Sequence, residues 1–262
     1  MTIDIFQIDA FTDKLFGGNP AAVCPLKEWL PDNTLLNIAK ENNLAETAFF
    51  VHKENNLFHL RWFTPEIEMD LCGHATLASA YVIFNDLNYK SDEVIFDTMS
   101  GKLAVKKVDN QLEMDFPSRP PSPSKLPEII SKALSIQPVE IFKARDYVLI
   151  YNSENDIKNL KVSASVLSAI NLDPGGIIVT SKGTNSDFVS RFFTPGASVF
   201  EDPVTGSAHC TLVPFWANRL NKNELHAFQI SERKGELVCK LIEDRVTIKG
   251  SAVKYLEGKI EV

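Results

Sequence analysis

RWFTPEIEMDLCGHATLASAYV, residues 61–82, has a counterpart later in the chain in RFFTPGASVFEDPVTGSAHCTL, residues 191–212. Each copy contains a β-like run that ends in Thr-Pro, followed by a glycine that opens an apolar helical run. The glycine lies 8 positions after the proline in the first copy and 11 positions after it in the second. A strand, a proline turn, a glycine and an apolar helix in the same order predict two similar halves.

The run after Gly73 is apolar or small at nearly every position of HATLASAYVIF, residues 74–84. A helix that is apolar all round is expected to be buried rather than amphipathic. Gly206 opens the corresponding run in the second half. A helix start carries unpaired N–H groups and a partial positive charge, so two such starts facing one cleft are suited to bind a carboxylate.

Outward from these two stretches, the pattern predicts mixed α and β structure. Alternating apolar residues predict strands, and helical periodicity predicts helices. The predicted strands cover residues 3–10, 47–51, 57–63, 228–230, 237–242 and 245–249, and the predicted helices cover 33–43, 73–84, 126–136 and 163–170. Pro214 lies inside the second apolar helix and predicts a kink there.

The stretch FPSRPPSPSKLP, residues 116–127, holds five prolines. Proline cannot continue a helix or a central strand, so this stretch is interpreted as a linker. It divides the chain into an N-terminal half, residues 1–116, and a C-terminal half, residues 117–262. The last residues, 251–262, are expected to complete a sheet in either half.

Composition excludes several classes of function. The chain has 262 residues, 44% of them hydrophobic, and a formal net charge of −7 without a dense Lys/Arg run, which argues against nucleic acid as a partner. The N-terminus does not resemble a signal peptide, and no apolar run is long enough to span a bilayer. The four cysteines form no C-x-x-C pair, so we expect a cytoplasmic protein with reduced thiols and no metal.

Four stretches together make the sequence resemble the phenazine-biosynthesis-like (PhzF-like) isomerases. They are DAFTDKLFGGNPAAV (9–23), NNLAETAFF (42–50), RWFTPEIEMDLCGHATLASAYV (61–82) and FFTPGASVFEDPVTGSAHCTL (192–212). The resemblance implies a diaminopimelate epimerase-like α+β fold: two pseudo-symmetric halves, each a curled mixed sheet around a buried central helix. It also implies an active site between the halves, a homodimer, and isomerisation of a small carboxylate substrate without a cofactor.

The resemblance also implies a role for particular residues. The glutamate of the family's N-A-E-T-A-type motif is the catalytic acid/base and corresponds to Glu46. The substrate-binding positions correspond to His74 and Gly73 in the first half. In the second half they correspond to Asp202, Gly206 and Ser207.

Each of these residues also has a structural interpretation. Glu46 is at the start of an apolar strand, where a carboxylate at a strand edge usually faces water. His74 and Ser207 can be ordinary residues of a first helical turn, and Asp202 precedes a proline as turn residues often do. Asn19, in GGNP, is interpreted as a turn residue and left out of the site. His209 is expected either to line the cleft or to pack behind it.

Two other functions stay open. Epimerases and racemases of this fold use two thiols, each directly before the glycine of a helix start. Here the first position is Cys72 but the second is Thr205, and Cys210 lies further into the helix. Cys72 is therefore interpreted as a small buried residue, and a thiol-dependent epimerase or racemase is the alternative enzyme. The other alternative is a protein that binds small carboxylates without catalysis.

Overall fold

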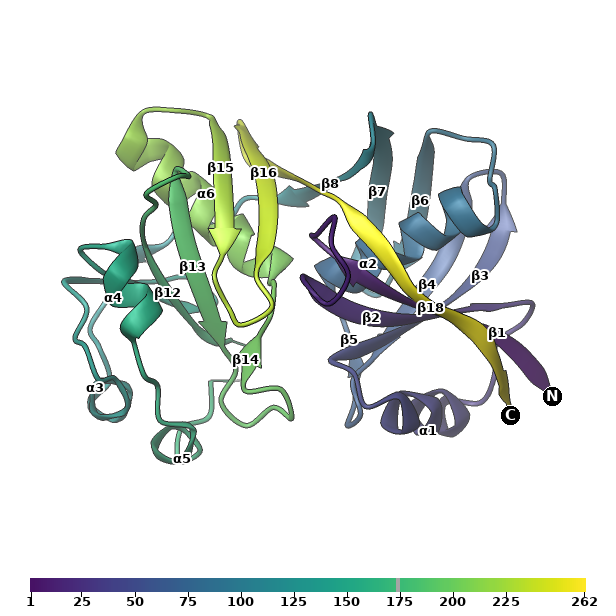
Figure 1. Ribbon diagram of the computed structural model, residues 1–262, viewed down its shortest axis with the longest axis horizontal. Helices are drawn as coiled ribbons and strands as arrows, with labels where there is room; N and C mark the ends of the chain where they lie inside the picture. Colours follow the sequence, from purple (N-terminus) through teal and green to yellow (C-terminus); the bar gives the residue numbers. More distant parts are fainter. Residues whose placement is uncertain (173–174) are drawn as a thin grey trace. The chain divides into compact units, whose positions relative to one another are not determined.

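The computed structural model describes residues 1–172 and 175–262. The chain forms two compact units, one made of Met1–Phe116 and Thr247–Val262 and the other of Pro117–Val246 (Figure 1). The proline-rich linker therefore begins the second unit. The closing segment, expected to complete a sheet in either half, belongs to the first unit: Thr247–Val262 is part of it, and the last strand pairs with the first strand of the chain.

The first unit is a mixed sheet with two helices and a π-helical turn. Its elements are β1 (Thr2–Ala10), β2 (Asn19–Leu26), α1 (Asp32–Asn42), β3 (Glu46–Glu54), β4 (Leu57–Phe63), β5 (Glu68–Met69), α2 (Gly73–Tyr81), η1 (Val82–Asp86), β6 (Glu93–Thr98), β7 (Gly101–Val108), β8 (Gln111–Pro117) and β18 (Ala252–Glu261). The strands pair in the order β18–β1–β2–β3–β4–β6–β7–β8, with parallel pairing at β2–β3 and β4–β6.

The second unit repeats this succession of strands. Its elements are β9 (Ser122–Pro123), α3 (Glu128–Ala133), β10 (Glu140–Lys143), β11 (Tyr147–Ile150), α4 (Glu154–Asn159), α5 (Ala164–Leu167), β12 (Ile177–Lys182), β13 (Phe188–Phe193), β14 (Glu201–Asp202), α6 (Gly206–Leu220), β15 (Glu224–Gln229) and β16 (Gly235–Ile242). β9 to β13, β15 and β16 pair in that order, with parallel pairing at β11–β12 and β13–β15. β17 (Arg245–Gly250) spans the boundary between the units. Both units are thus α+β.

The two Thr-Pro turns have the same construction. Arg61 on β4 binds both carboxylate oxygens of Glu68 on β5, at 2.7 and 2.6 Å. Arg191 on β13 binds both oxygens of Glu201 on β14, at 2.7 and 2.8 Å. A bidentate Arg–carboxylate pair fixes both groups in one plane. Each pair therefore anchors the short strand that leads to the central helix of its unit.

The two apolar helices are buried, as their sequences predict. Every residue of α2 from Gly73 to Ala80 is buried, and α2 packs against β1, β2 and β3. Its hydroxyl groups do not need outside partners, because Thr76 and Ser79 donate to the carbonyls of Cys72 and Ala75, four residues earlier. α1 packs on another cluster of the same sheet through Leu35, Ile38 and Ala39.

Most of the predicted elements are confirmed, and the differences have local causes. The predicted helix 126–136 is shorter, because α3 ends at Ala133 and Leu134 adopts an extended conformation that bridges to Val162. α6 continues through Pro214 without an interruption. Proline lacks an N–H and leaves the carbonyl of Cys210 free, and the backbone N–H of Arg119 in the linker donates to that carbonyl at 2.9 Å. Within the described residues, no helix is long and apolar enough to cross a membrane.

Candidate active site

The first unit brings Glu46 and His74 together. Glu46 is the first residue of β3, and His74 is the second residue of α2. The Glu46 Oε2 and His74 Nε2 atoms are 3.2 Å apart, and the two side chains are 16% and 5% exposed. The strand-edge interpretation of Glu46 is wrong for this structure, since its carboxylate is directed to a buried imidazole rather than to water. Gly73 is the buried first residue of the same helix.

Asn19 determines which nitrogen of His74 carries the proton. The Asn19 Nδ2 amide lies 3.1 Å from His74 Nδ1 and donates to it, so the ring proton is on Nε2, facing Glu46. Burial lowers the pKa of His74 to about 3. The imidazole is therefore neutral at physiological pH, and its Nε2–H is directed toward the Glu46 carboxylate.

The interpretation of Asn19 as a turn residue only was wrong. It is the first residue of β2 and is fully buried. The sequence signal was ambiguous, because an asparagine between glycine and proline is common in turns. Its contact with His74 depends on the pairing of β2 with β1 and β3, which is tertiary information.

Cys72 also touches His74. It is the N-cap of α2, and its Sγ lies 3.5 Å from His74 Nδ1. Glu46, Cys72 and His74 are residue types that bind zinc, and their ligand atoms lie within 4.8 Å of one another. However, Cys72 faces Nδ1 while Glu46 faces Nε2 on the opposite side of the ring. Cys72 and Glu46 are thus each recorded against a different nitrogen of His74.

In the second unit, Ser207 is held by an arginine that the sequence did not indicate. Arg145 Nη2 donates to Ser207 Oγ at 2.9 Å, in the first turn of α6. Arg145 also contacts Asp146, a buried carboxylate that accepts the N–H of Gly176 at 2.8 Å. Because the Ser207 oxygen accepts from a cation, its own O–H is oriented to donate to another group.

Asp202 lies in the turn that leads into α6. Its carboxylate accepts the hydroxyl of Thr205, the N-cap of the helix. Gln229 joins the two residues: its Oε1 accepts the Thr205 N–H at 2.9 Å, and its Nε2 donates to the Asp202 carbonyl at 2.7 Å. Gln229 is fully buried, so this turn is fixed by polar contacts from β15. Gly206, the first residue of α6, is buried beside it.

His209 packs inside the second unit. It is fully buried, its ring lies 5.8 Å from that of Phe188, and its Nδ1 donates to the Thr205 carbonyl at 2.8 Å. Burial lowers the pKa of His209 to about 4, against the opposing effect of that hydrogen bond. His209 is thus a neutral core residue that closes the first turn of α6.

Sequence reasoning missed Arg145 and Gln229. Arg145 stands outside every motif quoted above, two residues before β11, and nothing in its neighbourhood distinguishes it from a surface arginine. Gln229 lies in the middle of the predicted strand 228–230 and is the last residue of β15, whose residues alternate like those of any half-buried strand. Both act on the start of α6 from strands distant in sequence, so only the fold reveals them.

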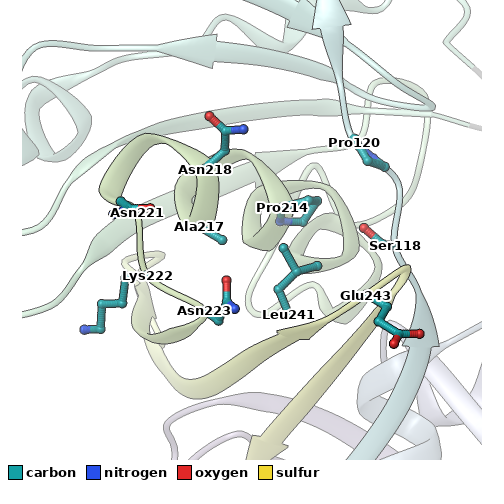
Figure 2. Close-up of a pocket in the computed structure, with 10 residues that line it drawn as sticks. All are labelled: Ser118, Pro120, Pro214, Ala217, Asn218, Asn221, Lys222, Asn223, Leu241 and Glu243. Atoms are coloured by element: carbon teal, nitrogen blue, oxygen red, sulfur yellow. The ribbon is translucent and has the colours of Figure 1, made fainter.

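The large pocket of the second unit does not coincide with these residues. It has a volume of about 660 Å³ and is lined by residues of the linker, of the C-terminal part of α6 and of β16, as Figure 2 shows. Its α6 residues begin at Pro214, whereas the candidate residues surround Gly206, about 12 Å earlier along the helix. Lys222, a lysine of its lining, already binds Asp187 at 2.8 Å. The polar groups at the two helix starts are therefore the candidate site, and the pocket is separate from the one at α6.

Comparisons with known proteins identify the family to which the chain is similar. The pattern that defines the phenazine biosynthesis-like protein family, PhzC-PhzF, matches residues 8–258. An uncharacterised isomerase of Pseudomonas aeruginosa is 46% identical, with all of both chains covered. A crystal structure of a PhzF-family protein of Enterococcus faecalis is 43% identical, covers all of both chains and has a TM-score of 0.95.

More distant structures share the fold alone. A hydroxyproline epimerase of Agrobacterium vitis has a TM-score of 0.60 at 8% identity, covering 99% of this chain and 92% of that one. The mixed α+β fold is therefore common to PhzF-family and epimerase structures. Taken with the match over residues 8–258 and the full-length relatives, these findings show that the chain belongs to the phenazine biosynthesis-like family.

Proposed function

We propose that this protein is an isomerase that shifts a proton, and with it a double bond, within a small unsaturated or cyclic carboxylic acid, with Glu46 as general acid/base. The observation that carries the proposal is the pair formed by Glu46 and a neutral, buried His74, 3.2 Å apart. A carboxylate held beside a neutral donor in a largely enclosed site is suited to take up and return one proton.

The proposed step balances without a cofactor. The Glu46 carboxylate takes a proton from one carbon of the substrate, and the electrons of that C–H bond form a new double bond. The electrons of the original double bond move to the far carbon, which takes the proton back from the Glu46 carboxyl group. The substrate gains and loses no atoms, so no oxidant or reductant is required.

His74 is proposed to orient the catalytic carboxylate and the substrate. Its Nε2–H faces Glu46, and Asn19 keeps the ring in this tautomer. A neutral imidazole does not lock Glu46 into a permanent ion pair, so the carboxylate stays available for protonation. The proton carrier in this scheme is therefore Glu46, and His74 is its positioning residue.

The second unit is proposed to bind polar groups of the substrate. Ser207, fixed by Arg145, has an O–H free to donate to a carboxylate oxygen, and the first-turn N–H groups of α6 begin at Gly206. The Asp202 carboxylate is held by Thr205 within the same turn. At the start of α2, the backbone N–H groups that begin at Gly73 are proposed to bind the substrate in the same way as those at Gly206.

A thiol-dependent epimerase is the second candidate, and Cys72 is the observation that favours it. Its thiol lies 3.5 Å from His74 Nδ1, the nitrogen that also accepts from Asn19, at the start of α2. The corresponding N-cap of α6 is Thr205, however, and the pKa of Cys210 is raised to about 12 by burial. A second thiol base at the α6 start is therefore lacking among the residues that the structure describes.

Hydrogen exchange with solvent tests the proposal. Proton NMR in deuterated water, with a panel of small cyclic and unsaturated carboxylates, should reveal a substrate through deuterium incorporation at a carbon. Glu46→Gln keeps the shape of the side chain but cannot ionise. The exchange rate of this variant should therefore be lower by a factor of about 10²–10⁴. Glu54→Gln, at the exposed end of the same strand, is the matched control and should exchange normally.

The same assay separates the two mechanisms. Cys72→Ala should retain most of the exchange rate if Glu46 is the acid/base. A folded but inactive Cys72→Ala together with an active Glu46→Gln would reverse the assignment in favour of the epimerase. Requirement for an added organic cofactor would also contradict the proposed step.

A further inference from the structure

In each unit, a serine of a hairpin turn contacts the segment that leads into the central helix. In the first unit, Ser100 lies in the turn between β6 and β7, and its Oγ donates to the carbonyl of Asp70 at 2.8 Å. In the second unit, Ser231 lies in the turn between β15 and β16, and its Oγ donates to the carbonyl of Pro203, also at 2.8 Å. Both distances are typical of a well-formed hydrogen bond from a hydroxyl group.

The two contacts occupy equivalent places in the duplicated fold. Asp70 directly follows β5, and Pro203 directly follows β14. Asp70 lies three positions before Gly73, where α2 begins. Pro203 lies three positions before Gly206, where α6 begins. Each serine therefore holds the corresponding carbonyl of its own unit.

The contact is present in both units although the surrounding loops differ in length. The turn between β6 and β7 consists of residues 99–100, whereas the turn between β15 and β16 consists of residues 230–234. The helix glycine follows the proline of the Thr-Pro turn by 8 positions in the first unit and by 11 in the second. Loops usually vary when no constraint acts on them, so a contact kept through both changes indicates a constraint on the helix starts.

Each turn is itself fixed by side-chain contacts. In the first unit, the Thr98 hydroxyl donates to the Gly101 carbonyl at 2.7 Å and accepts the N–H of Ser100 at 3.2 Å. In the second unit, Ser231 Oγ accepts the N–H of Lys234 at 3.2 Å. Because these bonds hold the turns, each serine is a donor with a fixed position.

The second turn also packs closely against the segment that it holds. Ser231 is 5% exposed, and Val204, the residue that follows the held carbonyl, is fully buried. A Cβ added at Gly235, the first residue of β16, would lie 2.2 Å from a methyl group of Val204. Only glycine permits this approach, so the turn and the segment before α6 form one packed structure.

A held carbonyl determines how the helix begins. The peptide group is planar, so a hydrogen bond to one carbonyl also orients the N–H of the next residue. Only two residues lie between each held carbonyl and the glycine of its helix. The N–H groups of the first helical turn have no partner within the helix, and their direction therefore depends on the segment before them.

We propose that Ser100 and Ser231 are positioning residues of the candidate site, which hold the starts of α2 and α6 in the orientation that the substrate requires. Ser100 acts on the helix that carries His74, and Ser231 acts on the helix that carries Ser207. The catalytic effect of each serine rests on the proposed isomerase function, whereas its effect on the order of the helix start does not.

Amide hydrogen exchange of the whole protein, measured by NMR without substrate, tests the effect on order. The amides of Thr76 and Thr205 are hydrogen-bonded at the starts of α2 and α6. Ser100→Ala should raise the exchange rate of the Thr76 amide about fivefold, as expected for the loss of one hydrogen bond. Ser231→Ala should do the same for the Thr205 amide. Neither variant should change the exchange rate in the other unit.

Steady-state kinetics of deuterium incorporation into the substrate tests the catalytic effect. Ser100→Ala should lower the turnover number about tenfold with little change in KM, because His74 orients the catalytic carboxylate. Ser231→Ala should raise KM about fivefold with little change in the turnover number, because Ser207 binds the substrate. Ser100→Thr keeps the hydroxyl and should restore the turnover number.

Two other serines provide matched controls. Ser91 donates to the carbonyl of Glu93 at 2.8 Å in the first unit, and Ser186 donates to that of Phe188 at 3.0 Å in the second. Ser91→Ala and Ser186→Ala each remove the same kind of hydrogen bond away from the helix starts. They should lower the thermal stability by a similar amount and leave both kinetic constants unaltered.

Two results would overturn the proposal. One is unchanged exchange of the Thr76 and Thr205 amides in folded Ser100→Ala and Ser231→Ala. The other is a change of the kinetic constants in the controls as large as in these two variants, which would reflect stability alone. If the original protein acts on no member of the carboxylate panel, the proposed isomerase function fails, and the amide exchange rates still decide whether the serines hold the helix starts.

Discussion

At the scale of single residues, the candidate site depends on side chains outside the motif positions, because they orient the motif residues through hydrogen bonds. Asn19 fixes the tautomer of His74, and Arg145 fixes the hydroxyl of Ser207. His74 and Ser207 each follow the glycine that begins the central helix of their unit. Each is oriented by a side chain near the start of a strand, Asn19 at β2 and Arg145 before β11. This common arrangement supports equivalent binding roles for His74 and Ser207.

The Arg145–Ser207 contact leads to a prediction about substrate affinity. Ser207→Ala removes the hydroxyl but keeps the Arg145–Asp146 pair, so KM should rise about tenfold, as expected for one hydrogen bond to a charged group. The turnover rate and the thermal stability should change little. Steady-state kinetics of the exchange reaction, with a thermal unfolding curve, measures both.

A double-variant cycle is the control. Arg145→Met should also raise KM, and it should lower stability because the buried Asp146 loses its cation. If Arg145 acts through Ser207, the combined variant should have the KM of Arg145→Met alone. Additive losses would show instead that the two residues bind the substrate separately.

At the scale of elements, the two Thr-Pro turns differ in how strongly they are anchored. Arg191 binds Glu201 and also donates to the carbonyls of Ile157 and Leu160, next to the C-terminal end of α4, at 3.0 and 2.8 Å. Arg61 instead reaches Asp32, which is 76% exposed. Arg191 thus satisfies backbone groups that have little access to water, whereas Arg61 adds a contact at the surface.

This difference predicts unequal costs for the same substitution. Arg191→Met should lower the free energy of unfolding by about 3 kcal/mol, because it leaves Glu201 and two carbonyls without their donor. Arg61→Met should cost about half as much, since Asp32 is solvated without it. Urea denaturation of the two variants measures both values, and equal losses would contradict this account of the turns.

The elements also show what the sequence could predict. The apolar sequence pattern was sufficient to predict that α2 and α6 are buried. A helix that is apolar on every side is stable only when it is surrounded by other parts of its unit. The repeated Thr-Pro turn and glycine located both helix starts to the residue. Residues such as Arg145 and Gln229 could not be found in this way, because their partners are distant in sequence and their own neighbourhoods are ordinary. Glu46 itself was identified through the family resemblance and not through periodicity.

At the scale of the whole molecule, the chain crosses from one unit to the other twice. The first unit is completed only by its closing segment, Thr247–Val262, whose strand β18 pairs with β1. The sequence predicts the first crossing, because a proline-rich linker is a strong local signal. The return carries no such signal, since β17 runs through the boundary as a continuous strand. Its pairing partner is set by the fold of residues about 250 positions earlier.

Each unit contains one buried histidine, His74 in the first and His209 in the second, and together they predict how acid destabilises the molecule. Burial lowers the pKa of His74 to about 3 and that of His209 to about 4. In the unfolded chain both have a pKa of about 6.5, so below that pH the unfolded chain binds more protons than the folded one. The free energy of unfolding should therefore be highest above pH 6.5 and fall as the pH drops, by about 2–3 kcal/mol between pH 7 and pH 5.5. Urea denaturation across this range measures the slope. His74→Gln and His209→Gln should each remove about half of it, and a slope that neither substitution changes would show that other groups control the acid response.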